Sequence, residues 1–186
     1  MWPLGHVAVA YLCYTLATRH RFDASPGQLA AVAVVFGSQF PDLVDKPLAW
    51  YAAVLPTGRT LAHTLFVLVP LAIGLYALVS RSGRGEYAIA FAIGALSHSL
   101  VDAAPALWGE RVAAEHLLWP LTPVTPYESG SPSILELLRG SASDPFFLAE
   151  FVLAALALAL WRRDGYPGLG LLRTTLARLR PTPTDG

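Results

Sequence analysis

The sequence predicts an all-α protein, a multi-pass membrane bundle of about five transmembrane helices. Of its 186 residues, 54% are hydrophobic and 14% are charged, and the mean hydropathy is +0.49. Soluble domains carry about 25% charged residues, so this chain is too poor in charge for an ordinary soluble domain. Its apolar residues also gather in long stretches between polar connections, which is the pattern of a membrane protein.

Five stretches are the expected spans, in chain order residues 4–18, 27–44, 60–80, 86–107 and 145–161. A helix rises ~1.5 Å per residue and a hydrocarbon core is ~30 Å thick, so the third and fourth stretches are comfortably long. The first two are short, and they either thin the bilayer locally or form a partly inserted hairpin. The polar run at 19–23 between them favours an aqueous position for their turn.

The basic residues predict the orientation. One set follows the first, third and fifth stretches and comprises Arg19, Arg21, Arg81, Arg84, Arg162, Arg163, Arg173, Arg178 and Arg180. The other connections hold only Lys46, Arg59, Arg111 and Arg139. By the positive-inside rule the larger set is cytoplasmic, which places the N-terminus outside the cell membrane and the C-terminus inside. We therefore expect a membrane domain at 1–162, with an outer loop at 108–144, and a basic cytoplasmic tail at 163–186.

Histidine and aspartate side chains recur at the outer ends of these stretches, and the set is His6, Asp42, Asp45, His63, His98 and Asp102. Ionisable residues inside a membrane are costly and usually face a wet or buried polar site. His98 and Asp102 are four residues apart and share one helix face. Solvated helix ends and hydrogen-bonded membrane histidines would explain single members, but their shared membrane face predicts a metal site. Such donors suit one or two divalent ions, Zn²⁺ first, with Mn or Fe as alternatives.

Two further residues are candidates for catalysis. Arg59 lies four residues before His63, so on a helix it would project from the same face, either to clamp a phosphate or carboxylate or to reach the membrane interface. His116 lies in the connection 108–144, which is long enough to fold over the site as a lid. The sequence is compatible with three roles for His116: a further metal ligand, a general acid, or a loop residue without a role in the site.

Composition excludes other classes of function. The formal net charge is zero, so no basic groove for nucleic acid is expected. The lone Cys13 allows neither a disulfide framework nor a paired-cysteine metal site.

These residues resemble the YdjM-like family of inner-membrane metal-dependent hydrolases, also described as LexA-binding inner-membrane-associated hydrolases. The matching pieces are Gly5-His6, Pro41-Asp42 with Asp45, Arg59 before His63, Ser97-His98 with Asp102, and Leu117-Leu118-Trp119-Pro120. They cover most of residues 5–120 in order. The resemblance implies a hydrolase whose metal ligands are His6, Asp42, His63, His98 and Asp102. The family's second acidic residue usually follows the first by two positions, so the resemblance supports Asp45 less than Asp42 as a direct ligand.

Together these observations predict a metal-dependent hydrolase of a lipid or lipid-linked ester, foremost a phosphoester, at the outer membrane face. A bound ion lowers the pKa of its water to ~7, and two ions ~3.5–4 Å apart suit a phosphoester. The rival is a non-enzymatic carrier of metal ions or protons, in which the same residues form a station on a transport path. A membrane scaffold that docks a regulator through its basic tail is a third reading.

Overall fold

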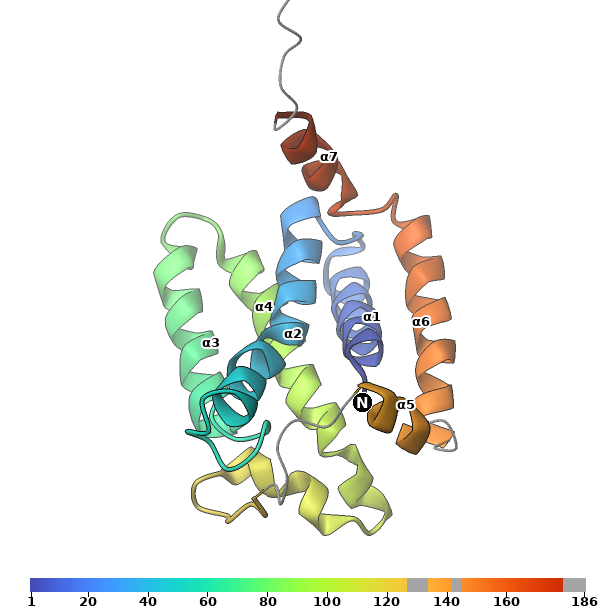
Figure 1. Ribbon diagram of the computed structural model, residues 1–186. Coiled ribbons are helices and arrows are strands. Elements are labelled where there is room, and N and C mark those ends of the chain that lie inside the picture. Colours follow the sequence, from blue (N-terminus) through green and yellow to red (C-terminus); the bar gives the residue numbers. More distant parts are fainter. Residues whose placement is uncertain (127–133, 142–144, 179–186) are drawn as a thin grey trace, which may run out of the picture.

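Figure 1 shows a computed structural model, which describes residues 1–126, 134–141 and 145–178. In these residues the chain forms helices and no strand, so the predicted all-α class is confirmed. The elements are α1 Pro3–Phe22, α2 Gln28–Trp50, α3 Leu65–Ser80, α4 Gly85–Asp102, the 3₁₀ helices η1 Ala104–Trp108 and η2 Arg111–Leu118, α5 Ile134–Ser141, α6 Pro145–Arg163 and α7 Leu169–Arg178. Helix α7 lies within the predicted basic tail. Residues 127–133 and 142–144 of the predicted loop 108–144, and the tail beyond 178, lie outside the described residues.

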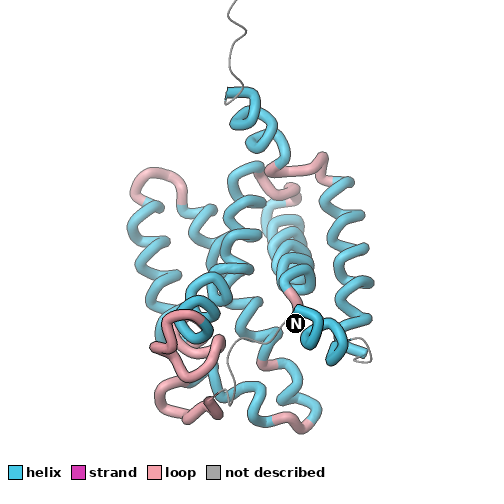
Figure 2. The backbone as a smooth tube through the Cα atoms, viewed as in Figure 1, coloured by secondary structure: helices cyan, strands magenta, loops and turns pink. Residues whose placement is uncertain are grey.

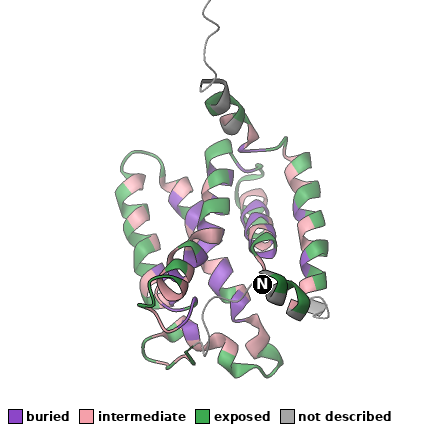
Figure 3. Ribbon diagram, in the orientation of Figure 1, coloured by how far each residue is buried: buried purple, intermediate pink, exposed green. Residues whose placement is uncertain are grey.

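The helices form a bundle built around α4. Helix α4 packs against α1, α2 and α3, and α1 also packs against α2 and α6. Figures 1 and 2 show the N-terminus, α5 and the 3₁₀ helices at one end of the bundle, and the α3–α4 turn and α7 at the other. Buried residues gather where α1, α2 and α4 face one another, whereas α3 and α6 are largely exposed (Figure 3).

The exposed surface of the bundle is rich in large apolar side chains. Ile73 and Leu78 on α3 are 65% and 68% exposed, and Leu158 on α6 is 59% exposed. Only Leu68 of α3 is buried, and a helix that is apolar all round but not covered by protein fits lipid rather than water. Among the described residues only 85–108 is both long and apolar enough to span a membrane, and α3 is apolar but shorter. The five-span arrangement stays a prediction.

Two glycines bring α2 and α4 into backbone contact. A Cβ on Gly37 would lie 2.2 Å from the carbonyl oxygen of Phe91, and a Cβ on Gly94 would lie 2.4 Å from that of Val34. No side chain fits at either position, because real Cβ contacts are never this short. Small residues at a crossing let membrane helices approach closely. This crossing sets the distance between the polar residues at the ends of α2 and α4.

The third helix begins later than the sequence predicts. Residues 60–64 form a turn, and α3 starts at Leu65, where the Thr64 side chain accepts a hydrogen bond from the Phe66 amide at 3.4 Å. The expectation that Arg59 and His63 share a helix face is therefore wrong. Helix α2 extends further than its predicted span and contains Pro41 and Pro47. It changes direction along its length (Figure 1), as expected of a helix that lacks those two amide donors.

Candidate metal centre

All six predicted ligand residues come together at one end of the bundle, and all are buried. Helix α1 supplies one of them, α2 and α4 supply two each, and the turn before α3 supplies the last. In that order they are His6, Asp42, Asp45, His98, Asp102 and His63. A shared, buried position is what the pattern of His and Asp residues predicts.

Asp42, His63 and His98 form the first candidate ion position. One ligand atom from each lies within 4.8 Å of the others. The Asp42 Oδ1 is 3.6 Å from the His63 Nε2 and 3.7 Å from the His98 Nε2. The two Nε2 atoms are 3.2 Å apart. A carboxylate oxygen and two imidazole nitrogens therefore converge from three different elements.

The partners of the two rings fix their protonation. The His63 Nδ1 lies 2.8 Å from Asp45 and the His98 Nδ1 lies 2.6 Å from the Ser38 carbonyl oxygen. Neither partner has a hydrogen to donate, so both Nδ1 atoms carry the proton and donate it. In the neutral rings each Nε2 then holds a lone pair, and these lone pairs face each other and a carboxylate. A cation between them, a metal ion or a proton, relieves that repulsion.

His6, His98 and Asp102 form the second candidate position, again within 4.8 Å. The His6 ring stacks on the His98 ring at a centroid distance of 3.6 Å. The His6 Nε2 is 3.4 Å from the Asp102 Oδ1, and its buried Nδ1 has no hydrogen-bond partner among the described residues. The two positions share His98, whose Nε2 lone pair binds one ion. A second ion would depend on His6 and Asp102.

Asp45 stands outside both groups. Its carboxylate accepts hydrogen bonds from the amides of Thr60 at 2.7 Å and Ala62 at 2.8 Å as well as from His63. Both of its oxygens are therefore occupied. In this position Asp45 folds the turn that carries His63 and holds the imidazole in the orientation that exposes Nε2 to Asp42.

Arg59 and Lys46 place positive charge at the edge of the centre. The Arg59 Nε donates to the Asp102 Oδ2 at 2.8 Å, and its side chain is 44% exposed. The Lys46 Nζ lies 2.5 Å from Asp42 one helical turn earlier. Each ligand carboxylate thus has a partly exposed cation beside it. The sequence prediction did not include Lys46 in the site, although its spacing of four residues from Asp42 indicates a pair on one helix face.

His116 packs against the centre without joining either group. It is buried in η2, its ring meets the His63 ring edge to face at 5.8 Å, and its Nε2 donates to the Ser99 carbonyl oxygen at 3.1 Å. Burial lowers the pKa of His116 to about 4, so the ring is neutral at physiological pH. The segment after η2 is anchored beside it, because the Thr64 hydroxyl donates to the Trp119 carbonyl oxygen at 2.7 Å.

Glu150 on α6 is a buried polar residue that the sequence prediction did not place in the site. Its two carboxylate oxygens accept from the Trp2 amide at 3.0 and 3.1 Å, beside the first turn of α1. A Cβ on Gly5 would lie 2.6 Å from Glu150, so glycine at that position admits the carboxylate. The sequence marks Glu150 only as a single acidic residue in an otherwise apolar stretch. In the structure Glu150 holds the N-terminal end of α1, the helix that carries His6.

An all-helical bundle with an apolar surface and a buried His and Asp cluster at one end defines a candidate membrane metalloprotein. Residues 1–172 match the model of the YdjM inner membrane protein family, and the chain belongs to that family. The resemblance stated from the motifs is confirmed, and the family supports a membrane location. Searches of curated proteins and of solved structures found no match.

Proposed function

We propose that the protein is a membrane-embedded metal-dependent hydrolase that cleaves a phosphoester or other ester of a lipid or lipid-linked substrate. The observation that carries this proposal is the convergence of Asp42 with two imidazoles whose Nε2 lone pairs face each other at 3.2 Å. Catalytic metal sites commonly use three protein ligands of this kind and leave a further position open. Zn²⁺ suits the donor set best, with Mn or Fe as alternatives.

The residues present fit a divalent ion, and they divide into ligands and residues that position the ligands. Asp42, His63 and His98 would hold it, with Asp102 and His6 beside them for a second ion. A bound ion supplies a water of lowered pKa and polarises the ester. The tautomer of His63 is set by Asp45, and that of His98 by the Ser38 carbonyl. Helices α1, α2 and α4 exclude bulk water, because the ligand side chains are buried.

Arg59 is suited to hold the anionic group of the substrate. Its Nε donates to Asp102, and its two terminal amino groups donate no hydrogen bond to another residue within the described part of the chain. A guanidinium offers two parallel donors to an anion, which match a phosphate better than a lone ammonium does. Neutral His116 already donates its Nε2 proton to the Ser99 carbonyl, so beside His63 it is suited to accept a proton from the attacking water through Nδ1.

The proposed orientation puts this centre at the outer membrane face, with five spans, the N-terminus outside and the C-terminus in the cytoplasm. Helices α1, α3 and α6 run from the end that holds the centre to the opposite end (Figure 1). Arg19, Arg81 and Arg162 lie at their far ends. These three arginines thus lie away from the centre, which supports the orientation from the positive-inside rule.

The test is metal content and activity in purified protein. His63→Ala and His98→Ala should lose most bound metal and the hydrolysis of a panel of phospholipids and lipid phosphates. His20→Ala is the matched control, because His20 is exposed near the other end of α1 and should leave both unchanged. Full metal in both ligand variants would disprove the centre. Metal without hydrolysis of any ester in the panel would favour the second candidate below.

The second candidate is a carrier of metal ions or protons. One observation favours it, because a proton between the two Nε2 atoms relieves their repulsion as a metal does. A carrier needs polar groups that continue across the membrane, yet α3 is apolar along its described length apart from its last residue. Proteoliposome flux of Zn²⁺ or H⁺ that disappears in His63→Ala would support this reading.

A further inference from the structure

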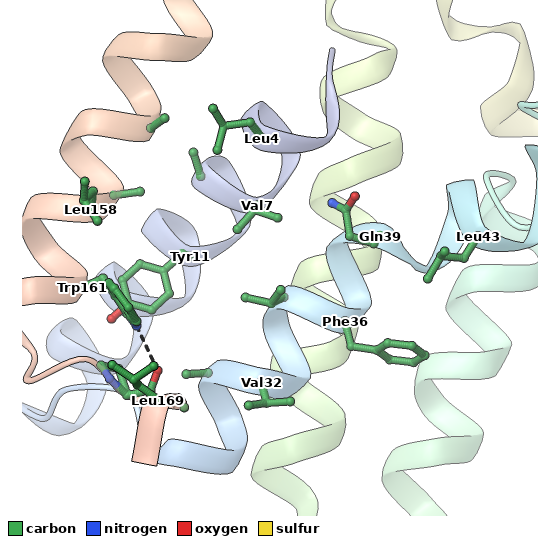
Figure 4. Close-up of a pocket in the computed structure, with 17 residues that line it drawn as sticks. Leu4, Val7, Tyr11, Val32, Phe36, Gln39, Leu43, Leu158, Trp161 and Leu169 are labelled. Atoms are coloured by element: carbon green, nitrogen blue, oxygen red, sulfur yellow. Dashed lines mark hydrogen bonds between the residues drawn. The ribbon is translucent and has the colours of Figure 1, made fainter. Parts of the chain in front are cut away.

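An apolar groove runs between α1, α2 and α6 (Figure 4). It has a volume of about 740 Å³, and its lining includes Leu4, Val7, Val35, Phe36 and Leu158. We propose that this groove binds one acyl chain of the lipid whose head group reaches the metal centre. The inference rests on the proposed function for the identity of the substrate and adds where its chain lies.

The polar side chains that line the groove already donate hydrogen bonds to other described residues. The Tyr11 hydroxyl donates to Asp164 at 2.8 Å and the Trp161 Nε1 donates to the Pro167 carbonyl oxygen at 2.9 Å. The Gln39 amide donates to the Pro3 carbonyl oxygen at 3.3 Å. Because the polar side chains of the lining already donate within the protein, the groove favours hydrocarbon.

The groove has the length of one leaflet. On α2 its lining runs from Ala31 to Leu43, a rise of ~18 Å at ~1.5 Å per residue. Half of a hydrocarbon core is ~15 Å. A groove of this length fits a single chain of the leaflet that faces the centre.

One end of the groove lies beside the segments of α1 and α2 that carry ligand residues. Leu4 precedes His6 by two residues on α1, and Leu43 follows Asp42 directly on α2. The partly exposed Lys46 and Arg59 pair with Asp42 and Asp102 near this end, so an anionic head group is complementary to it. A chain that enters from lipid gains little hydrophobic free energy. The head group therefore supplies the affinity, and the groove determines which ester bond reaches the ions.

The experiment uses phosphatidic acid with a photoreactive diazirine on its palmitoyl chain, in phosphatidylcholine vesicles that contain the full chain. Cross-links should map to α1, α2 and α6. Val35→Trp fills the middle of the groove and should lose them, and Leu158→Trp does the same from the facing helix. Ile73→Trp is the matched control, because Ile73 is 65% exposed on α3 and does not line the groove. It should keep the cross-links.

Two results would overturn the inference. One is cross-linking spread evenly over all exposed helices, including α3. The other is unchanged cross-linking in both groove variants while they retain the metal and a single species on size-exclusion chromatography. The hydrolase proposal fails separately, because cross-links confined to the groove without ester hydrolysis would keep the lipid site and remove only the reaction.

Discussion

At the scale of single residues, the chemistry of the centre depends on which imidazole nitrogens keep their protons. Ser38 contributes a backbone carbonyl and Asp45 a carboxylate, and both hold a histidine Nδ1–H. Neither is needed as a direct ligand. Both ensure that the Nε2 lone pairs point at one place, so the affinity for an ion depends on residues that do not touch it.

Asp45→Asn tests this positioning role. Three N–H donors share the two carboxylate oxygens, whereas an amide offers one oxygen and places an NH₂ against a donor. Loss of such a partner lowers metal affinity by about 10–100-fold, so we expect weakened binding that saturating Zn²⁺ restores. Asp42→Asn is the comparison. Saturating Zn²⁺ should not restore metal binding in that variant, because Asp42 belongs to the ligand group. Equilibrium dialysis measures both, and an unchanged Zn²⁺ affinity in Asp45→Asn would refute the role.

The sequence was sufficient to name the residues that gather at the centre, because each is an ionisable side chain in or beside an apolar stretch. It was not sufficient to pair them. The contact between Arg59 and Asp102 joins residues 43 apart, and Glu150 reaches Trp2 across the bundle. Such pairs depend on how the helices pack, which no local spacing encodes.

At the scale of elements, the start of α3 shows why a helix boundary escapes local patterns. Residues 60–64 directly precede the apolar run of the helix, and the amides of Thr60 and Ala62 bind the Asp45 carboxylate. Those bonds hold the segment as a turn instead of a first helical turn. The deciding partner lies 15 residues earlier in the chain, on another helix.

The crossing of α2 and α4 is the element-scale feature on which the centre depends. Gly94→Ala would set a methyl group against the backbone of α2, and overpacking of this kind costs about 1–3 kcal/mol. It should also pull His98, one turn later, from the Ser38 carbonyl and reduce bound metal. Gly74→Ala is the control, since nothing lies within 4 Å of its Cβ, and it should be neutral or stabilising. Thermal unfolding in detergent and metal content measure both, and equal behaviour of the two variants would contradict a close crossing.

At the scale of the whole molecule, the protein has an apolar surface and a polar centre at one end. Arg19 and Tyr11 bind Asp164 near the opposite end, where α7 also lies (Figure 1). The two ends of the bundle are therefore chemically different. In a membrane, each end would face a different side. The direction in which the bundle inserts decides whether the centre meets outer-leaflet or inner-leaflet lipids.

Cysteine labelling decides that direction. Ser82 lies in the exposed α3–α4 turn and Val112 lies exposed on η2, at opposite ends of the bundle (Figures 1 and 2). Exposed Cys13 is first replaced by Ala, so that Ser82→Cys and Val112→Cys each carry a single thiol. If the basic end is cytoplasmic, a membrane-impermeant maleimide added to intact cells should label position 112 and reach position 82 only after lysis. The reverse pattern would place the centre at the cytoplasmic face, and the search for its lipid would then turn to the inner leaflet.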